Sequence, residues 1–199
     1  TDEDYYNIYA LGIPSKSKHT IFNHQKEYTQ LPEKTETILG LDFGYVDETA
    51  LCITHHRENE VYVEELLYES YLTTPEVIQK IKEIFKVYNL PMHSTIVCDY
   101  ARPEIIEDMR RHGFNCANAI KNIQEGIDSI KSKELHIHKD SYNLKKELGN
   151  YKWKLKGDMV TDVPVDKFNH LMDAMRYAIL YHKRNNISIG GWDFTSFSI

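Results

Sequence analysis

The sequence has few cysteines and no long apolar run. Cys52, Cys98 and Cys116 are odd in number, and no Cys-x-x-Cys pair occurs among them. This argues against a disulfide framework or a cysteine zinc site and fits reduced thiols packed in a core. No apolar stretch approaches the roughly 18 residues of a membrane span, and the polar, aromatic start Thr1–Tyr6 lacks the pattern of a secretory signal. We therefore expect a protein that is not secreted and has no membrane partner.

Positive charge is also scarce overall. The 199 residues include 24 Lys and Arg against 30 Asp and Glu, a formal net charge of −6. Such a balance is unlike that of proteins that coat nucleic acids. Between Lys121 and Lys156, however, nine lysines stand against five acids. Any contact with a polyanion is expected in this stretch.

The hydrophobic pattern predicts an α/β domain. Residues 1–36 show little periodicity and read as a leader or linker, whereas residues 37–184 alternate between apolar runs and amphipathic stretches. We expect strands at Thr37–Phe43, Ala50–His55, Val61–Tyr68, Thr95–Asp99 and Phe114–Ile120, and helices from Thr74, at Pro103–Arg111, Asn122–Lys131, Ser141–Leu148 and Phe168–Tyr181. These elements predict a mixed central sheet flanked by helices.

The C-terminal residues 185–199 are expected to form a flexible tail. The segment Gly190–Phe197 is led by glycine and rich in aromatic side chains. A mobile terminus is the plain interpretation. A docking peptide for a partner protein is the alternative, because exposed aromatic residues often mark interaction sites.

Three aspartates stand in unlike settings. Asp42 and Asp99 each close an apolar run that we expect to be a strand, and Asp173 lies inside the last predicted helix. A carboxylate in such a place loses solvation unless positive charge meets it. Core-strand ends and an inward-facing helix share the sheet edge at which α/β proteins build their sites. Because hard divalent cations prefer oxygen ligands, the sequence indicates a magnesium- or manganese-dependent site.

Each aspartate also has a plain structural explanation. Asp42 suits a turn, Asp99 suits a cap of the helix that follows it, and Asp173 suits an acid on a helix surface paired with Arg176 or Arg110. Only the combination of the three is specific.

His170 strengthens the case for a site. It precedes Asp173 by three residues, so both side chains lie on one face of the predicted helix. A core histidine satisfied by a hydrogen bond is the usual alternative, but its position beside an acid favours a role in the site.

Four stretches carry a resemblance to a known family. They are Gly-Leu-Asp-Phe-Gly-Tyr at 40–45 with Asp47 and Thr49-Ala50, Cys-Asp-Tyr-Ala-Arg-Pro-Glu at 98–104, Ile-Lys-Asn-Ile-Gln-Glu-Gly-Ile at 120–127, and Asn-His-Leu-Met-Asp-Ala-Met-Arg-Tyr-Ala at 169–178. In this order and spacing they resemble the nuclease motifs of the large terminase subunit of tailed bacteriophages. The resemblance covers roughly Thr37 to Lys183.

The resemblance implies an RNase H-like fold, with an added β-hairpin, and an endonuclease that uses two divalent cations, Mg²⁺ or Mn²⁺. Carried over by position, Asp42 would bridge the metals, Asp99 and Asp173 would be further ligands, and His170 would lie beside Asp173 in the site. The implied substrate is concatemeric double-stranded viral DNA, cut during genome packaging. The implied partners are the portal protein and the small terminase subunit, and the implied location is the host-cell cytoplasm, transiently at the procapsid portal.

The sequence departs from the family pattern in two places. The first motif often continues Asp-Pro-Thr-Ala, whereas this chain has Glu48 after Asp47. No Gly-x-x-x-x-Gly-Lys-Ser/Thr occurs, so the ATPase half of a large terminase is missing, and Tyr9–Gly12 resembles the end of that half. We therefore expect residues 1–36 to lead from a missing ATPase half.

Candidate DNA contacts are the lysines of the positive stretch. Lys152, Lys154 and Lys156 alternate with aromatic and apolar residues ahead of a turn at Gly157, which predicts a hairpin with one packed face and one lysine face. An edge strand guarded by lysines is an equal alternative to a DNA-groove wall. Lys121, at the end of a predicted strand, is placed to meet a phosphate or to neutralise the site.

Two other features leave alternatives open. His136 and His138 share one strand face and suit a soft metal, but without a third ligand in view a solvated strand is the better interpretation. For the whole domain, the rivals are another RNase H-like nuclease of the resolvase or transposase type, and a module that docks on the portal or small terminase subunit with little nuclease activity.

Overall fold

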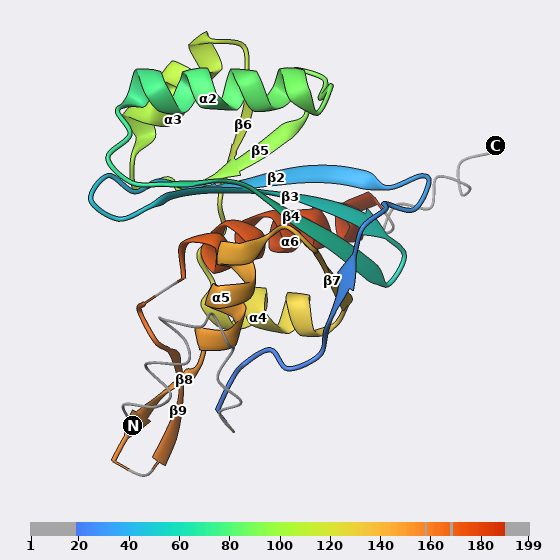
Figure 1. Ribbon diagram of the computed structural model, residues 1–199, viewed down its shortest axis with the longest axis vertical. Coiled ribbons are helices and arrows are strands. Elements are labelled where there is room, and N and C mark those ends of the chain that lie inside the picture. Colours follow the sequence, from blue (N-terminus) through green and yellow to red (C-terminus); the bar gives the residue numbers. More distant parts are fainter. Residues whose placement is uncertain (1–18, 158, 168, 190–199) are drawn as a thin grey trace, which may run out of the picture.

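The computed structural model describes residues 19–157, 159–167 and 169–189. A seven-stranded sheet carries helices on both faces, and a separate two-stranded hairpin projects from the body (Figure 1). The strands are β1 (Gln25–Tyr28), β2 (Glu36–Asp42), β3 (Thr49–Arg57), β4 (Glu60–Glu69), β5 (Thr95–Cys98), β6 (Asn115–Asn118), β7 (Glu134–His138), β8 (Trp153–Lys156) and β9 (Met159–Pro164). The helices are α2 (Thr74–Val87), α3 (Pro103–Arg111), α4 (Ile123–Lys131), α5 (Tyr142–Asn150) and α6 (His170–Ile189).

The large sheet is mixed, with the order β1-β7-β4-β3-β2-β5-β6. Strand β3 is antiparallel to its neighbours β2 and β4, and every other pairing is parallel. Six of the seven strands therefore run in one direction and end at the same edge. Asp42 is the last residue of β2 and Asp99 follows the last residue of β5, so both stand at this edge.

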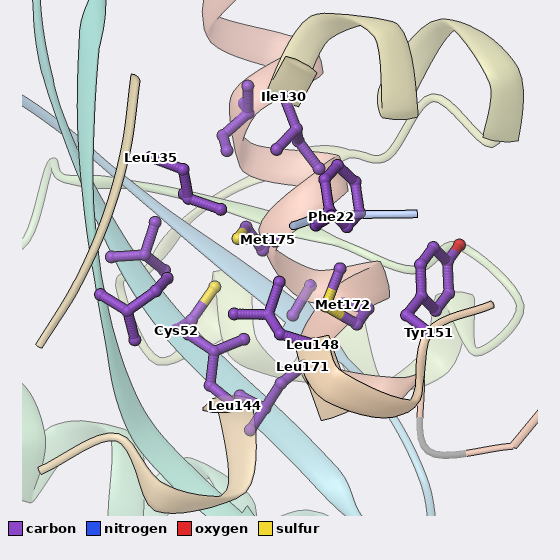
Figure 2. Close-up of a cluster of buried hydrophobic side chains, with 14 of the residues drawn as sticks. Phe22, Cys52, Ile130, Leu135, Leu144, Leu148, Tyr151, Leu171, Met172 and Met175 are labelled. Carbon is purple, nitrogen blue, oxygen red and sulfur yellow. The ribbon is translucent and has the colours of Figure 1, made fainter. Parts of the chain in front are cut away.

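Two hydrophobic clusters sandwich the sheet. On one face, α2 and α3 cover β2, β3 and β5 through residues such as Leu39, Ile81 and Met109. On the other face, α4, α5 and α6 pack against β3, β4 and β7, and Figure 2 shows this cluster around Met172 and Met175. Because β3 is covered on both sides, it is buried from Thr49 to His56, and its side chains there are mostly apolar or hydrogen-bonded.

Most predicted elements are confirmed, and two differ. Strand β1 was not expected, because the segment before it carries no alternating pattern; it joins the sheet beside β7, and Ile21 and Phe22 just ahead of it are buried. Helix α6 continues to Ile189, beyond the predicted end at Tyr181. The aromatic segment 190–197 lies outside the described residues. No helix within the described ranges is long and apolar enough to cross a membrane.

The prediction of a packed face on the hairpin was wrong. Strands β8 and β9 pair as expected, but the apolar side chains beyond Trp153 are exposed: Leu155, Met159, Val160 and Val163. Among the described residues, the base of the hairpin contacts the body: Trp153 packs against the core cluster, and the Lys131 Nζ lies 5.6 Å from the centre of its ring. The hairpin of β8 and β9 extends away from the sheet and its helices (Figure 1), so the described residues of the body do not bury the apolar side chains near its tip.

Candidate metal centre

The ends of β2 and β5 place two of the aspartates side by side. The Asp99 N–H donates to the Leu41 carbonyl at 3.0 Å, so the pairing of the two strands continues as far as the aspartates. Leu41 and Cys98 belong to the cluster beneath α2 and α3. Side chains alternate along a strand, so the residues that follow them face α6 instead.

Gly40 lets α6 approach this edge. A Cβ atom at Gly40 would lie 1.8 Å from the carbonyl oxygen of Ala174, so no side chain fits between β2 and the helix backbone. The neighbouring Asp173 and, one turn earlier, His170 are thereby carried to the end of β2. Because Gly40 has no side chain, α6 packs closely on β2, and this packing sets how near Asp173 and His170 lie to the end of the strand.

Asp42 is the most enclosed carboxylate of the three. It is 7% exposed, and burial raises its pKa, with the negative charges of Asp173 and Asp99 acting in the same direction. The hydrogen bond from His170 opposes this rise; its Nδ1 lies 3.0 Å from Asp42 Oδ2. The same bond raises the pKa of His170 to about 8, against the effect of burial.

Each aspartate has a cationic partner. Lys121 forms an ion pair with Asp99, and its Nζ also lies 4.8 Å from the centre of the Tyr100 ring. Arg176 Nη2 lies 2.7 Å from Asp173 Oδ1. Together with the hydrogen bond between His170 and Asp42, these ion pairs offset the repulsion among the three carboxylates.

The Arg176 side chain is buried where α6 packs against Gly126 of α4. It is 3% exposed, and a Cβ atom at Gly126 of α4 would collide with its side chain at 2.2 Å. Gly126 therefore leaves room for the aliphatic part of the Arg176 side chain, whose guanidinium pairs with Asp173 one turn earlier on α6. The close contact at Gly126 lets α4 pack against α6, although the two helices lie far apart in sequence.

The plain explanations of the aspartates are partly correct. Asp99 Oδ1 accepts from the N–H of Ala101 at 2.9 Å, which makes a local turn and not a helix cap. Asp173 does pair with Arg176, but inside the protein and not on a surface. The turn after Asp42 is closed instead by Thr49, whose Oγ1 donates to the Gly44 carbonyl at 2.7 Å.

Sequence reasoning missed Glu147 on α5. It is 1% exposed and accepts from the Met172 N–H at 3.0 Å and from the Tyr68 hydroxyl at 2.9 Å. It therefore faces the N-terminal turn of α6 at Met172, a residue between His170 and Asp173, where free backbone N–H groups favour an anion. Burial raises its pKa to about 7. The sequence did offer one indication: Glu147 falls on the buried face of α5, beside Leu144 and Leu148.

Several candidate residues lie away from the aspartates. Lys152, Lys154 and Lys156 belong to the projecting hairpin and its base, and Lys154 pairs with Asp166 at 2.6 Å. His136 and His138 lie on β7, which is two strands beyond β3 in the sheet.

The donor set at the β2 edge fits hard divalent cations. The pKa of Asp42 is raised mainly by burial and further by two neighbouring carboxylates, so this acid gains from positive charge placed beside it. The three aspartates do not form a group whose ligand atoms all lie within 4.8 Å of one another; among the described residues, the group with that spacing is Glu60, Glu134 and His136.

Comparisons with known proteins identify the fold. No family model matches the chain. In sequence it is similar to the large subunit of the terminase of Escherichia phage T5, with 29% identity over 158 residues, which are 74% of this chain and 35% of that protein. In structure it is similar to the nuclease domain of g2p, the large terminase of bacteriophage SPP1, solved with bound Mn, with a TM-score of 0.68, 19% identity, and coverage of 82% of this chain and 98% of that one.

The chain has the large-terminase nuclease fold. A second solved domain of this kind, from thermophilic phage G20c with bound magnesium, covers 82% of this chain and 97% of its own length, with a TM-score of 0.61 and 14% identity. The predicted RNase H-like mixed sheet with an added hairpin is thus confirmed. The chain spans about a third of the T5 relative, 35% of its length.

Proposed function

We propose that this chain is a metal-dependent endonuclease unit that cuts concatemeric double-stranded viral DNA during genome packaging. The observation that carries the proposal is the convergence of Asp42, Asp99 and Asp173 on one sheet edge, each beside a cationic side chain. The T5 relative is a large terminase, and the SPP1 and G20c domains were solved with manganese and magnesium. These likenesses support the same chemistry here.

The three aspartates would hold two divalent cations, Mg²⁺ or Mn²⁺, with Asp42 between them. Such a pair supplies an activated water and stabilises the leaving oxygen of a phosphodiester. Asp42 would contribute a carboxylate already deprived of water by its 7% exposure, so little solvent has to be displaced from it. Glu147 would hold the first turn of α6, and with it His170 and Asp173, at a fixed distance from β2.

The cationic side chains would have a second use. Lys121 forms an ion pair with Asp99, and its side chain, which is 36% exposed, would be able to move from this carboxylate to a DNA phosphate. His170 would keep its hydrogen bond to Asp42 and orient that carboxylate. Lys152, Lys154 and Lys156 would offer further phosphate contacts from the hairpin, at a distance from the aspartates.

The catalytic unit would comprise residues 37–184, with strand β1 and the buried Ile21 and Phe22 packed onto it. In the wider assembly we propose, the chain acts with the portal protein and the small terminase subunit in the host cytoplasm, at the procapsid. Residues 1–36 would connect it to an ATPase half.

Plasmid cleavage tests the proposal. Supercoiled plasmid is incubated with the protein in manganese, magnesium or EDTA, beside Asp42→Asn and the exposed-surface control Asp128→Asn. We expect nicked and linear DNA with either metal and none in EDTA. The cleavage rate of Asp42→Asn should fall by at least about 100-fold, because losing a direct metal ligand costs more than losing a group that only orients a ligand. Cleavage that survives EDTA or Asp42→Asn would refute the metal mechanism.

A docking role is the second candidate. The exposed apolar side chains Leu155, Met159, Val160 and Val163 on the hairpin favour it, because clustered exposed apolar residues mark interaction surfaces. In the same assay, the absence of cleavage in every metal, by protein that binds Mn²⁺ in a calorimeter, would favour a docking module over a nuclease.

A further inference from the structure

A second group of potential metal ligands lies at the opposite edge of the sheet. Glu60 opens β4 and Glu134 opens β7, and the two are paired directly across the parallel strands. His136 follows two residues after Glu134, on the same face. In the ladder, Tyr68 near the end of β4 is opposite Ala50, which is opposite Asp42. Eight residues of β4 therefore separate Glu60 from the aspartate edge, roughly 25 Å.

The three side chains have the spacing of a metal site. His136 Nε2 lies 3.4 Å from Glu134 Oε1 and 3.6 Å from Glu60 Oε1. One ligand atom from each of the three residues lies within 4.8 Å of the other two. Ligand atoms held about 2.0–2.2 Å from one tetrahedral ion lie roughly 3.3–3.6 Å apart. The separations from the imidazole nitrogen fall in this range.

His136 itself is the observation that points to a ligand. It is only 9% exposed, its Nε2 is enclosed, and this atom makes no hydrogen bond within the described part of the chain although two carboxylates stand near it. The ring is fixed by stacking on Tyr62, with centroids 4.4 Å apart and planes 16° apart. A buried polar atom without a partner carries a free-energy cost that a bound cation would remove.

Lys26 on β1 shows that this position attracts positive charge. Its ammonium forms an ion pair with Glu134, and its side chain is 65% exposed. An exposed lysine of this kind turns into solvent at little cost, since surface ion pairs contribute about 0–1 kcal/mol. A divalent cation would therefore displace it and gain both carboxylates.

We propose that Glu60, Glu134 and His136 form a zinc site that is separate from the aspartate centre. An imidazole nitrogen with two carboxylates suits zinc, whereas magnesium prefers a shell of oxygens and water. The three protein ligands come from two adjacent strands, and a water molecule would complete the tetrahedron. Bound zinc would join the starts of β4 and β7 at the side of the sheet where β1 is added.

Zinc titration in a background that lacks the aspartate centre tests this site. Protein carrying Asp42→Asn and Asp173→Asn is titrated calorimetrically with ZnCl₂ at pH 7.5, and binding of Co²⁺ is followed by its visible absorption, which is intense only in four-coordinate sites. We expect one zinc per chain, a rise in Tm with zinc, and intense Co²⁺ bands. His136→Phe keeps an aromatic ring on Tyr62 and removes the ligand, so it should lose at least roughly tenfold in affinity.

Matched variants keep the result interpretable. His138→Phe, on the same strand face but facing Glu64 at 3.8 Å, should bind zinc as the parent does. Glu60→Gln and Glu134→Gln change side chains that are 35% and 42% exposed, outside the core, so they test the ligands even if His136→Phe folds poorly. No saturable zinc binding, or equal binding by the parent and both glutamine variants, would overturn the proposal.

Discussion

The two edges of the central sheet both gather acids beside a histidine, but they are assembled in different ways. At the β2 edge, Asp42, Asp99 and Asp173 come from two strands and a helix, and their separation depends on how closely α6 packs at Gly40. At the other edge, Glu60, Glu134 and His136 come from two strands paired in register. The first arrangement depends on core packing, the second on backbone hydrogen bonds, so they should respond differently to mutation.

Gly40→Ala should have the largest effect on this contrast. The new methyl group would meet backbone at 1.8 Å, which no rotamer relieves, so α6 must move. We expect a loss of about 3 kcal/mol or more in the free energy of unfolding, a fall in Tm of roughly 6–12 °C, and loss of plasmid cleavage. Thermal denaturation and the plasmid assay measure both.

The control for this change is Gly126→Ala, where the obstacle is the flexible side chain of Arg176 and not backbone. It should cost less stability and reduce cleavage partially. Zinc binding at His136 should persist in both variants. If Gly40→Ala cleaves DNA normally, α6 does not need its close approach to β2.

Glu147→Gln should have an intermediate effect, visible in the pH dependence of stability. Burial raises the pKa of Glu147 from 4.5 to about 7. The folded protein therefore holds this proton between about pH 4.5 and 7 while the unfolded chain releases it, so this carboxyl makes stability fall as the pH rises through that window. Glutamine should remove the decline, which amounts to at most about 3 kcal/mol.

Urea denaturation in EDTA at several pH values measures this difference. Glu65→Gln, at a neighbouring acid on β4, serves as the comparison for losing one carboxylate near α5. Parallel pH profiles for the parent and Glu147→Gln would contradict the assignment of the decline to Glu147.

Lys26→Met should have the smallest effect on stability and sharpen the difference between the edges. Removing an exposed ion pair should change the free energy of unfolding by less than about 1 kcal/mol in EDTA. Zinc should bind more tightly, because the ammonium no longer competes for Glu134. Calorimetry in the Asp42→Asn, Asp173→Asn background measures the affinity, and weaker zinc binding in Lys26→Met would show that the lysine supports the site and does not compete for it.

Local patterns predicted much of the fold. The apolar runs that end at Asp42 and Cys98 became strands within one or two residues of the predicted bounds, and the Pro103 helix has the predicted limits. Strand β1 was not predicted, because its residues are mainly polar and its pairing partner β7 lies more than a hundred residues later. The hairpin was predicted, but not its exposure, which depends on where the body of the protein ends.

The candidate sites show the same division. Asp42, Asp99, Asp173 and His170 were chosen from the sequence because strand ends and helix faces have fixed geometry. Glu147 was missed, since its partners are a backbone N–H and a hydroxyl on other elements. His136 was set aside for want of a third ligand, which pairing with β4 supplies.

By itself, the sequence determined most of the strands and helices, and that Asp42 and Asp99 stand at strand ends, because these features depend on neighbours along the chain. Tertiary structure alone decided that Lys121 pairs with Asp99 and His170 with Asp42, that Gly126 leaves room for Arg176, and that Glu60 lies near His136. The reason is physical. Strand pairing and helix packing join residues that are remote in sequence, and the contacts that set charge and burial arise only at that stage.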